Sequence, residues 1–236
     1  MKERQTFSIK KPHLAYTLAT RISRRLGMAP IPFISRSSNE KNLPPKLKYN
    51  YQDPLAVEKL SEALAEHLQW LNPDGSRPLV VVGIGTDRST GDCLGPLVGS
   101  NLLHRANLPF AVYGTLDEPV HASNLAEKMT QIKTLYRDPL IIAVDACLGQ
   151  SENVGAITLA PGALKPGAGV NKNLPAVGDI HFTGIVNVGG YMEYFVLQNT
   201  RLSIVMGMAR QIAAAIYQGI SLVYQYRNQA VAQGLQ

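Results

Sequence analysis

The sequence predicts an α/β fold with a doubly wound, mostly parallel sheet flanked by helices. Segments of strand character alternate with segments of helical character along most of the chain. The segment "PLIIAVDA" (139–146) is almost entirely apolar, as expected for a strand in the middle of a parallel sheet. Hydrophobic residues make up 45% of the chain, which is enough for a buried core of this kind.

The elements follow from local patterns. A first helix is expected in "DPLAVEKLSEALAEHLQWL" (53–71), where apolar residues recur at helical spacing behind Asp53 as N-cap and Pro54 at the first helical position. Strands are expected at 78–84, 110–116, 139–146, 154–160 and 180–188, and further helices at about 96–104, 121–136 and 200–227. The fourth strand follows the third after a short connection, so we expect it to pair antiparallel or to lie at an edge.

The charge divides the chain into two parts. Residues 1–50 hold 11 Lys and Arg against 2 Glu, a balance of +9, whereas the remainder is −3 within a total of +6. The polar segment 37–52 indicates a linker. We therefore expect a basic leader at 1–50, partly disordered or loosely attached, and a single α/β domain at 51–236. Without a nucleic-acid motif, nucleic acid is an expected partner only through the leader.

Several classes of protein are excluded. No apolar run is long enough for a membrane span, and the N-terminus lacks a signal-peptide core. Two cysteines, Cys93 and Cys147, do not make a disulfide framework, so a cytoplasmic protein is expected. The loop "GIGTDRSTGDCLG" (83–95) has neither the lysine nor the glycine spacing of nucleotide-binding loops, and its aspartates would repel phosphate. We expect no cofactor.

Two aspartates are the strongest candidates for chemistry. Asp92 follows the first core strand and Asp145 ends the third, so both belong to the carboxyl edge of the predicted sheet, where ligands bind. Two converging carboxylates cannot both ionise at low cost, so the pair shares a proton and can act on water as base and acid. The alternatives are an N-cap role for Asp92 and a turn-forming role for Asp87. Asp145 is harder to explain structurally, because its apolar strand must satisfy a carboxyl group.

A metal site is the second alternative. If a metal binds, the sequence points to Asp92, Asp145 and His181 as ligands, because carboxylate and imidazole suit several divalent ions. A lone histidine beside a strand, such as His121 or His181, is more often structural. Packing is likewise the favoured role for the two cysteines.

Five segments in order resemble a known family: "GIGTDRSTGDCLGPLVG", "YGTLDEPVHA", "DACLG", "KPGAGVNKNLPAVGDIHFTGIVN" and "MEYFVLQNTRL". Together they resemble the YyaC-type sporulation proteins, relatives of the spore germination protease and, more distantly, of hydrogenase maturation proteases such as HybD. In the germination protease, "TPDALGP" and "IDAL" each supply an aspartate of a proposed catalytic pair. "TGDCLGP" and "VDAC" take those places here, so the resemblance implies catalytic roles for Asp92 and Asp145.

The resemblance implies the phosphorylase/hydrolase-like fold and a sporulation-associated peptidase, with protein or peptide substrates such as small acid-soluble spore proteins. The site would lie in the cytoplasm of the sporulating cell or forespore. The residues expected to contact substrate come from the Asp92 loop, the second strand's end and the "KPGAGVNK" loop: Thr86, Asp87, Arg88, Ser89, Thr90, His121, Lys165 and Lys172. A non-catalytic sporulation factor that binds a peptide or protein in the same crevice, a metal-dependent maturation-type protease, and a homo-oligomer all remain open.

Overall fold

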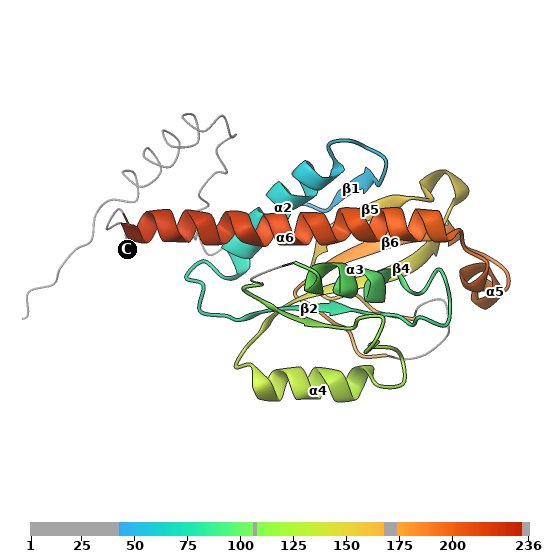
Figure 1. The fold of residues 1–236 in the computed structure, drawn as a ribbon, viewed down its shortest axis with the longest axis horizontal. Helices are drawn as coiled ribbons and strands as arrows, with labels where there is room; N and C mark the ends of the chain where they lie inside the picture. Colours follow the sequence, from blue (N-terminus) through green and yellow to red (C-terminus); the bar gives the residue numbers. More distant parts are fainter. Residues whose placement is uncertain (1–42, 106–107, 168–173, 233–236) are drawn as a thin grey trace, which may run out of the picture.

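The computed structural model describes residues 43–105, 108–167 and 174–232 (Figure 1). The elements in chain order are β1 (Leu47–Asn50), α2 (Ala56–Leu71), β2 (Leu79–Gly83), α3 (Leu94–Leu103), β3 (Ala111–Tyr113), α4 (Leu125–Leu135), β4 (Leu140–Gly149), the short 3₁₀ helix η2 (Ser151–Asn153), β5 (Ala156–Pro161), β6 (Ile180–Val188), α5 (Glu193–Gln198) and α6 (Leu202–Ala232). None of the helices in these ranges is both long and apolar enough to span a membrane.

The strands form one six-stranded sheet in the order β1-β5-β6-β4-β2-β3. Strands β3, β2, β4 and β6 are parallel to one another, whereas β5 runs antiparallel to β6 and β1 antiparallel to β5. The predicted fold, a mostly parallel sheet flanked by helices, is confirmed. The antiparallel pairing of β5 is one of the two arrangements expected from its short connection to β4.

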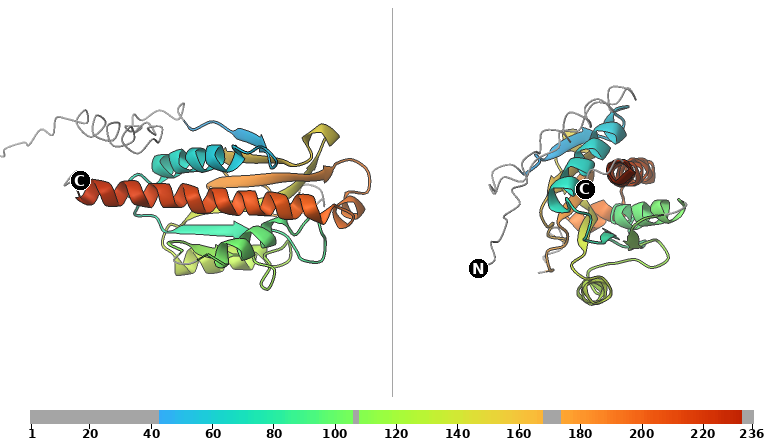
Figure 2. Two further views of the ribbon diagram at one scale, coloured as in Figure 1. Left: turned by 45° about the horizontal axis from the view of Figure 1, so that its top comes forward. Right: turned by 90° about the vertical axis from the view of Figure 1, so that its left-hand side faces the viewer.

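Helices cover both faces of the sheet. Figures 1 and 2 show α6 along one face with α2 and α3 beside it, and α4 on the opposite face. Alternate residues of β4 divide accordingly. Leu140, Ile142 and Val144 belong to the larger core cluster under α2, α3 and α6, whereas Ile141 and Ala143 belong to the smaller cluster under α4. The full burial of successive residues explains why this strand is apolar throughout.

The order of the strands reverses at β2. From β2 the chain passes through α3 to β3 on one side, and then through α4 to β4 on the other side. Because α3 and α4 cover opposite faces, the carboxyl ends of β2 and β4 flank the point where the two windings diverge. In open α/β sheets this point is where ligands bind.

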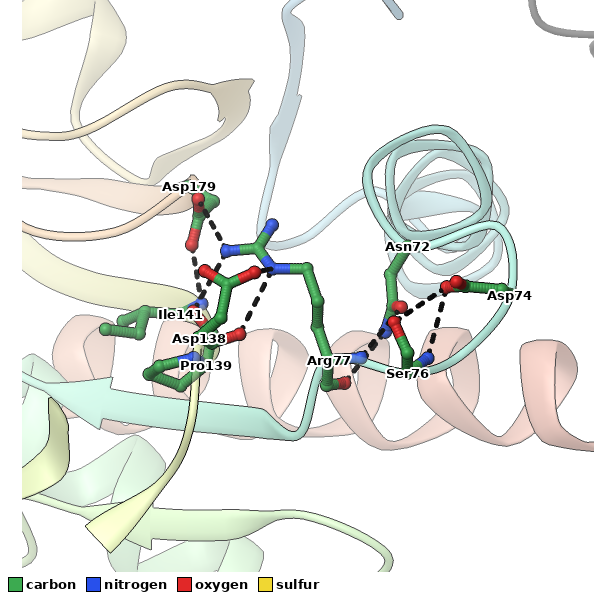
Figure 3. A network of polar contacts seen from close by, with 8 residues as sticks. All are labelled: Asn72, Asp74, Ser76, Arg77, Asp138, Pro139, Ile141 and Asp179. Carbon is green, nitrogen blue, oxygen red and sulfur yellow. Dashed lines mark hydrogen bonds and ion pairs between the residues drawn. The ribbon is translucent and has the colours of Figure 1, made fainter. Parts of the chain in front are cut away.

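The other end of the sheet is held by an ion-pair network (Figure 3). The guanidinium group of Arg77 lies 3.2 Å from carboxylate oxygens of both Asp138 and Asp179, and it donates to the backbone carbonyls of Asp138 and Pro139. Asp179 also accepts the N–H of Ile141 at 2.8 Å. The network therefore ties together the residues that precede β2, β4 and β6.

Two elements differ from prediction. Strand β1 lies inside the segment predicted as a linker (37–52) and pairs with β5, so the domain begins before residue 51. The pattern was missed because only Leu47 and Tyr49 of this short strand pack on the core. Helix α5 was also not predicted. Residues 1–42 of the basic leader lie outside the described residues. Asp53 was predicted to be the N-cap of this helix, but the N-cap of α2 is Leu55, and the Asp53 side chain instead accepts the N–H of Leu55 at 2.8 Å in the turn before the helix.

Candidate active site

The loop after β2 folds back on the end of its own strand. Ile84 donates its N–H to the carbonyl of Val144 in β4, and Gly85 donates to the carbonyl of Val120. Gly85 has a φ of +140°, and a Cβ there would lie 1.9 Å from the carbonyl oxygen of Asp92. Only glycine permits this contact, so Gly85 allows Asp92 to return to the carboxyl end of the sheet.

A second glycine positions the helix that follows the loop. A Cβ on Gly95 would lie 2.2 Å from the carbonyl oxygen of Ile84, so α3 packs backbone to backbone on the end of β2. The glycines of this segment therefore serve helix–strand packing.

Asp145 lies inside β4 on the face that α4 partly covers. It lies two residues beyond Ala143, which belongs to the smaller core cluster under α4, so the two side chains share a face of the sheet. Asp145 also pairs in register with Thr183 of β6. Its side chain is 8% exposed, and Oδ1 accepts the N–H of Ala146 at 2.9 Å. The buried carboxyl group thus has one backbone donor and opens onto the space beside β6.

Asp92 and Asp145 line one cavity of about 540 Å³. The side chains around it come from β4, β6, α5 and the segment after β5, and they include Asp92, Asp145, Cys147, Leu164, Lys165, His181, Thr183, Glu193 and Leu197. The two aspartates line one cavity, as expected, but Asp145 does not end its strand, because β4 continues to Gly149. Asp92 does not cap α3, whose N-cap residue is Cys93 and has no side-chain cap bond.

Burial and mutual repulsion decide the protonation of the pair. Burial raises the pKa of Asp145 well above its ordinary range, and the charge of Asp92 raises it further. Burial also raises the pKa of Asp92, but the N–H of Thr86 and the nearby His121 oppose that rise. The pKa of Asp145 is therefore raised more strongly than that of Asp92, so Asp92 is the member that ionises first as the pH rises.

The residues predicted to contact substrate are not all at this cavity. Among them, Lys165 lines it, whereas the following do not: Thr86, Asp87, Arg88, Ser89, Thr90 and His121. His121 nevertheless lies close enough to affect the charge of Asp92. Arg88 is exposed and, among the ion pairs of the described residues, pairs with neither aspartate. Lys172 lies outside the described residues.

The cavity does not have the geometry of a metal site. Asp92, Asp145 and His181 all line it, but among residues 43–105, 108–167 and 174–232 no three His, Cys, Asp or Glu side chains are close enough together to hold an ion. Nδ1 of His181 instead lies 2.8 Å from the carbonyl oxygen of Gly162. The donor set therefore does not fit the metal that a maturation-type protease would imply.

The lining residues that were not predicted as site residues include Cys147, Thr183, Glu193 and Leu197. Burial and the charge of Asp145 raise the pKa of Cys147 to about 11, which keeps the thiol protonated and weakly nucleophilic. Thr183 could have been found, because strand alternation puts it on the same face as His181. Glu193 and Leu197 could not, because they belong to the unpredicted helix α5.

Helix α5 also carries apolar side chains into solvent. The exposed cluster on α5 consists of Tyr194 and Phe195 of this helix together with Tyr191 and Met192 just before it, all at least half exposed. The N–H of Gly91 in the Asp92 loop donates to the carbonyl of Leu197 at 2.8 Å, which fastens α5 beside the site. An exposed apolar cluster next to a cavity is typical of a surface that binds another polypeptide.

Known proteins match this chain over the same region. The family described as "Protein of unknown function (DUF1256)" matches residues 48–215. "Uncharacterized protein YyaC" of Bacillus subtilis (strain 168) is 51% identical over 173 residues, which cover 73% of this chain and 81% of that protein. A solved structure, the [NiFe] hydrogenase maturation protease HycI from Thermococcus kodakarensis KOD1, is similar with a TM-score of 0.44 and 18% identity over 63% of this chain and 95% of that chain. The predicted likeness to YyaC is confirmed, and the chain belongs to the DUF1256 family.

Proposed function

We propose that this protein is a peptidase in which Asp92 and Asp145 activate water against a peptide bond. The observation that carries the proposal is the position of the pair. One carboxyl group from the loop after β2 and one from the neighbouring strand β4 line one cavity at the point where the strand order reverses, and burial raises the pKa of the second. Perturbed carboxyl pairs in a cavity are typical of hydrolytic sites.

The environments of the two acids assign their roles. Asp92 is the base, because the N–H of Thr86 and His121 favour its charged form. It takes a proton from water as the water oxygen bonds to the peptide carbon, and Asp145 gives its proton to the carbonyl oxygen. The C–N bond then breaks as the nitrogen takes the proton from Asp92. A hydroxyl of the intermediate returns a proton to Asp145, which restores the starting state.

The resemblance to the spore germination protease supplies the first substrate to test, a small acid-soluble spore protein, and the expected setting, the cytoplasm of a sporulating cell. The exposed cluster on α5 supports a polypeptide substrate, because it places apolar contact area beside the cavity. Glu193 and Leu197 of the same helix line the cavity itself.

The test is proteolysis by the full chain at pH values from about 4 to 8, a range that brackets a carboxyl pair sharing a proton. Asp92→Asn and Asp145→Asn are expected to lower kcat/KM by about 10²–10⁴-fold, because each removes a proton-transfer partner. Asp117→Asn, an exposed carboxylate outside the cavity, is the matched control. Activity that survives in both variants of the pair would exclude the mechanism.

A non-catalytic binding factor is the second candidate, and the cluster on α5 is the observation that favours it. It predicts that the wild-type protein binds a polypeptide without cleaving it. Binding would be lost on Phe195→Ser, whose exposed side chain contributes little to the fold, and retained in Asp145→Asn. Anisotropy of a labelled spore protein, read beside intact mass, separates the two functions.

A further inference from the structure

The sheet presents a polar strip on the face where Asp145 lies. In β1, β5 and β6 the residues that pack toward α2 and α6 alternate with residues that point to the opposite face. Tyr49 and Leu159, for example, belong with the larger core cluster, so Lys48 and Thr158 point the other way. Among the described residues, the only helix on that face is α4, whose buried residues pack with β2 and β4.

Four residues of this strip form one row across the sheet. Lys48 pairs in register with Thr158, Thr158 with Thr183, and Thr183 with Asp145. Residues in register on neighbouring strands share a face, so the row leads from the catalytic cavity to the edge strand β1. Asp145 and Thr183 line the cavity, Thr158 is buried at 6% exposure, and Lys48 at the far end is exposed.

The far end of the row is positively charged. Lys48 lies in β1 and Lys46 directly precedes this strand, and both lower the pKa of Cys147 in the cavity wall against stronger opposing causes. Lys48 donates to Asn153 of η2, which follows β4, so its ammonium group lies toward the end of the sheet that holds the cavity. Within the described residues no ion pair involves Lys46, Lys48 or Lys165.

We infer that the row is a substrate subsite in which Lys46 and Lys48 bind an acidic side chain of an extended polypeptide whose scissile bond lies at Asp145. The reference to a scissile bond rests on the proposed peptidase function. Three strand spacings of about 4.8 Å separate Asp145 from Lys48, or about 14 Å. An extended chain advances about 3.3 Å per residue, so the acidic residue lies about four residues from the cleaved bond.

The competing explanation is that lysines on an edge strand only prevent strand pairing with other molecules. That role does not depend on the charge of a substrate. The two explanations therefore differ in one outcome. Reversing the charges of Lys46 and Lys48 in the full chain changes the preference for acidic polypeptides only if these lysines bind substrate.

The test uses a degenerate pool of peptides about twelve residues long, which extend to roughly 40 Å. Mass spectrometry of the digest gives the residues around each cleaved bond. We expect wild type to enrich Asp and Glu about four residues from the cut by about five-fold, the range of an exposed ion pair. The double variant with Lys46→Glu and Lys48→Glu is expected to abolish this enrichment. Lys133→Glu, which reverses the charge of another exposed lysine on α4, is the control and is expected to retain it.

Binding separates this inference from the peptidase proposal. Two fluorescein-labelled pools, one with a fixed Glu and one with a fixed Gln, are titrated with wild type and with the double variant, and circular dichroism checks that the variant is folded. Cleavage without acidic enrichment overturns the subsite and leaves the peptidase standing. No cleavage, but a Glu preference that the double variant loses, supports the subsite and removes the peptidase. No preference in either assay overturns the subsite.

Discussion

Replacing Asp145 with asparagine tests whether the fold holds a buried proton. Asparagine has nearly the same shape, and its oxygen can still accept the N–H of Ala146. The variant therefore removes ionisation while keeping the packing. We expect it to be more stable than wild type near neutral pH, because the wild-type site is destabilised when the carboxyl group must ionise.

The size of this difference in stability between Asp145→Asn and wild type follows from the raised pKa of Asp145. Above the ordinary pKa of about 3.9, the unfolded chain has lost this proton while the folded protein still holds it. Since the unfolded state then binds fewer protons, the free energy of unfolding falls by up to about 1.4 kcal/mol per pH unit. The fall ends where the folded state also releases the proton. For each pH unit over which only the folded state holds the proton, this loss corresponds to about 3–6 °C in Tm.

The assay is thermal unfolding of wild type, Asp145→Asn and Asp117→Asn at several pH values. The advantage of Asp145→Asn over wild type should grow as the pH rises, and its end point measures the pKa of the buried pair. Asp117→Asn removes the same charge from an exposed turn, so its profile should run parallel to that of wild type. Parallel profiles for Asp145→Asn and wild type would show that burial does not hold a proton at this position.

Two further results are expected. Arg77→Ala should lower the free energy of unfolding by about 2–3 kcal/mol, because it leaves the partly buried Asp179 without its cation (Figure 3). Peptide cleavage should stay unchanged. Urea denaturation measures the loss of stability, and a variant as stable as wild type would refute a stabilising role for this ion-pair network. The pKa of about 11 leaves little thiolate at Cys147, so it should react with iodoacetamide at about pH 8 roughly a hundred-fold more slowly than a free thiol. Mass spectrometry follows the labelling of Cys147. Rapid labelling of this residue in the folded protein would contradict the prediction.

The alternation of strands and helices and the candidacy of Asp92 and Asp145 followed from local sequence patterns. The apolar runs that became β2 and β4 are buried on both faces, so their composition alone marks them as central strands. Asp145 was identifiable because a carboxyl group within such a strand requires a partner or a proton. The expected position of both acids at the carboxyl edge of the sheet predicted that they converge, and the family likeness added their catalytic roles.

The surroundings of the pair depend on the tertiary structure. The loop residues from Thr86 to Thr90 were predicted to bind substrate because they adjoin Asp92. In the structure Gly85 lets the backbone of Asp92 pack against the end of β2, and the cavity beside Asp92 is lined by residues of β6 and α5 instead of this loop. Strand β1 is too short to show a period, and Lys48 within it and Lys46 just before it resemble the lysines of a linker. The place of Lys48 in a row with Asp145 depends on the register of four strands, a set of long-range pairings that no local pattern encodes.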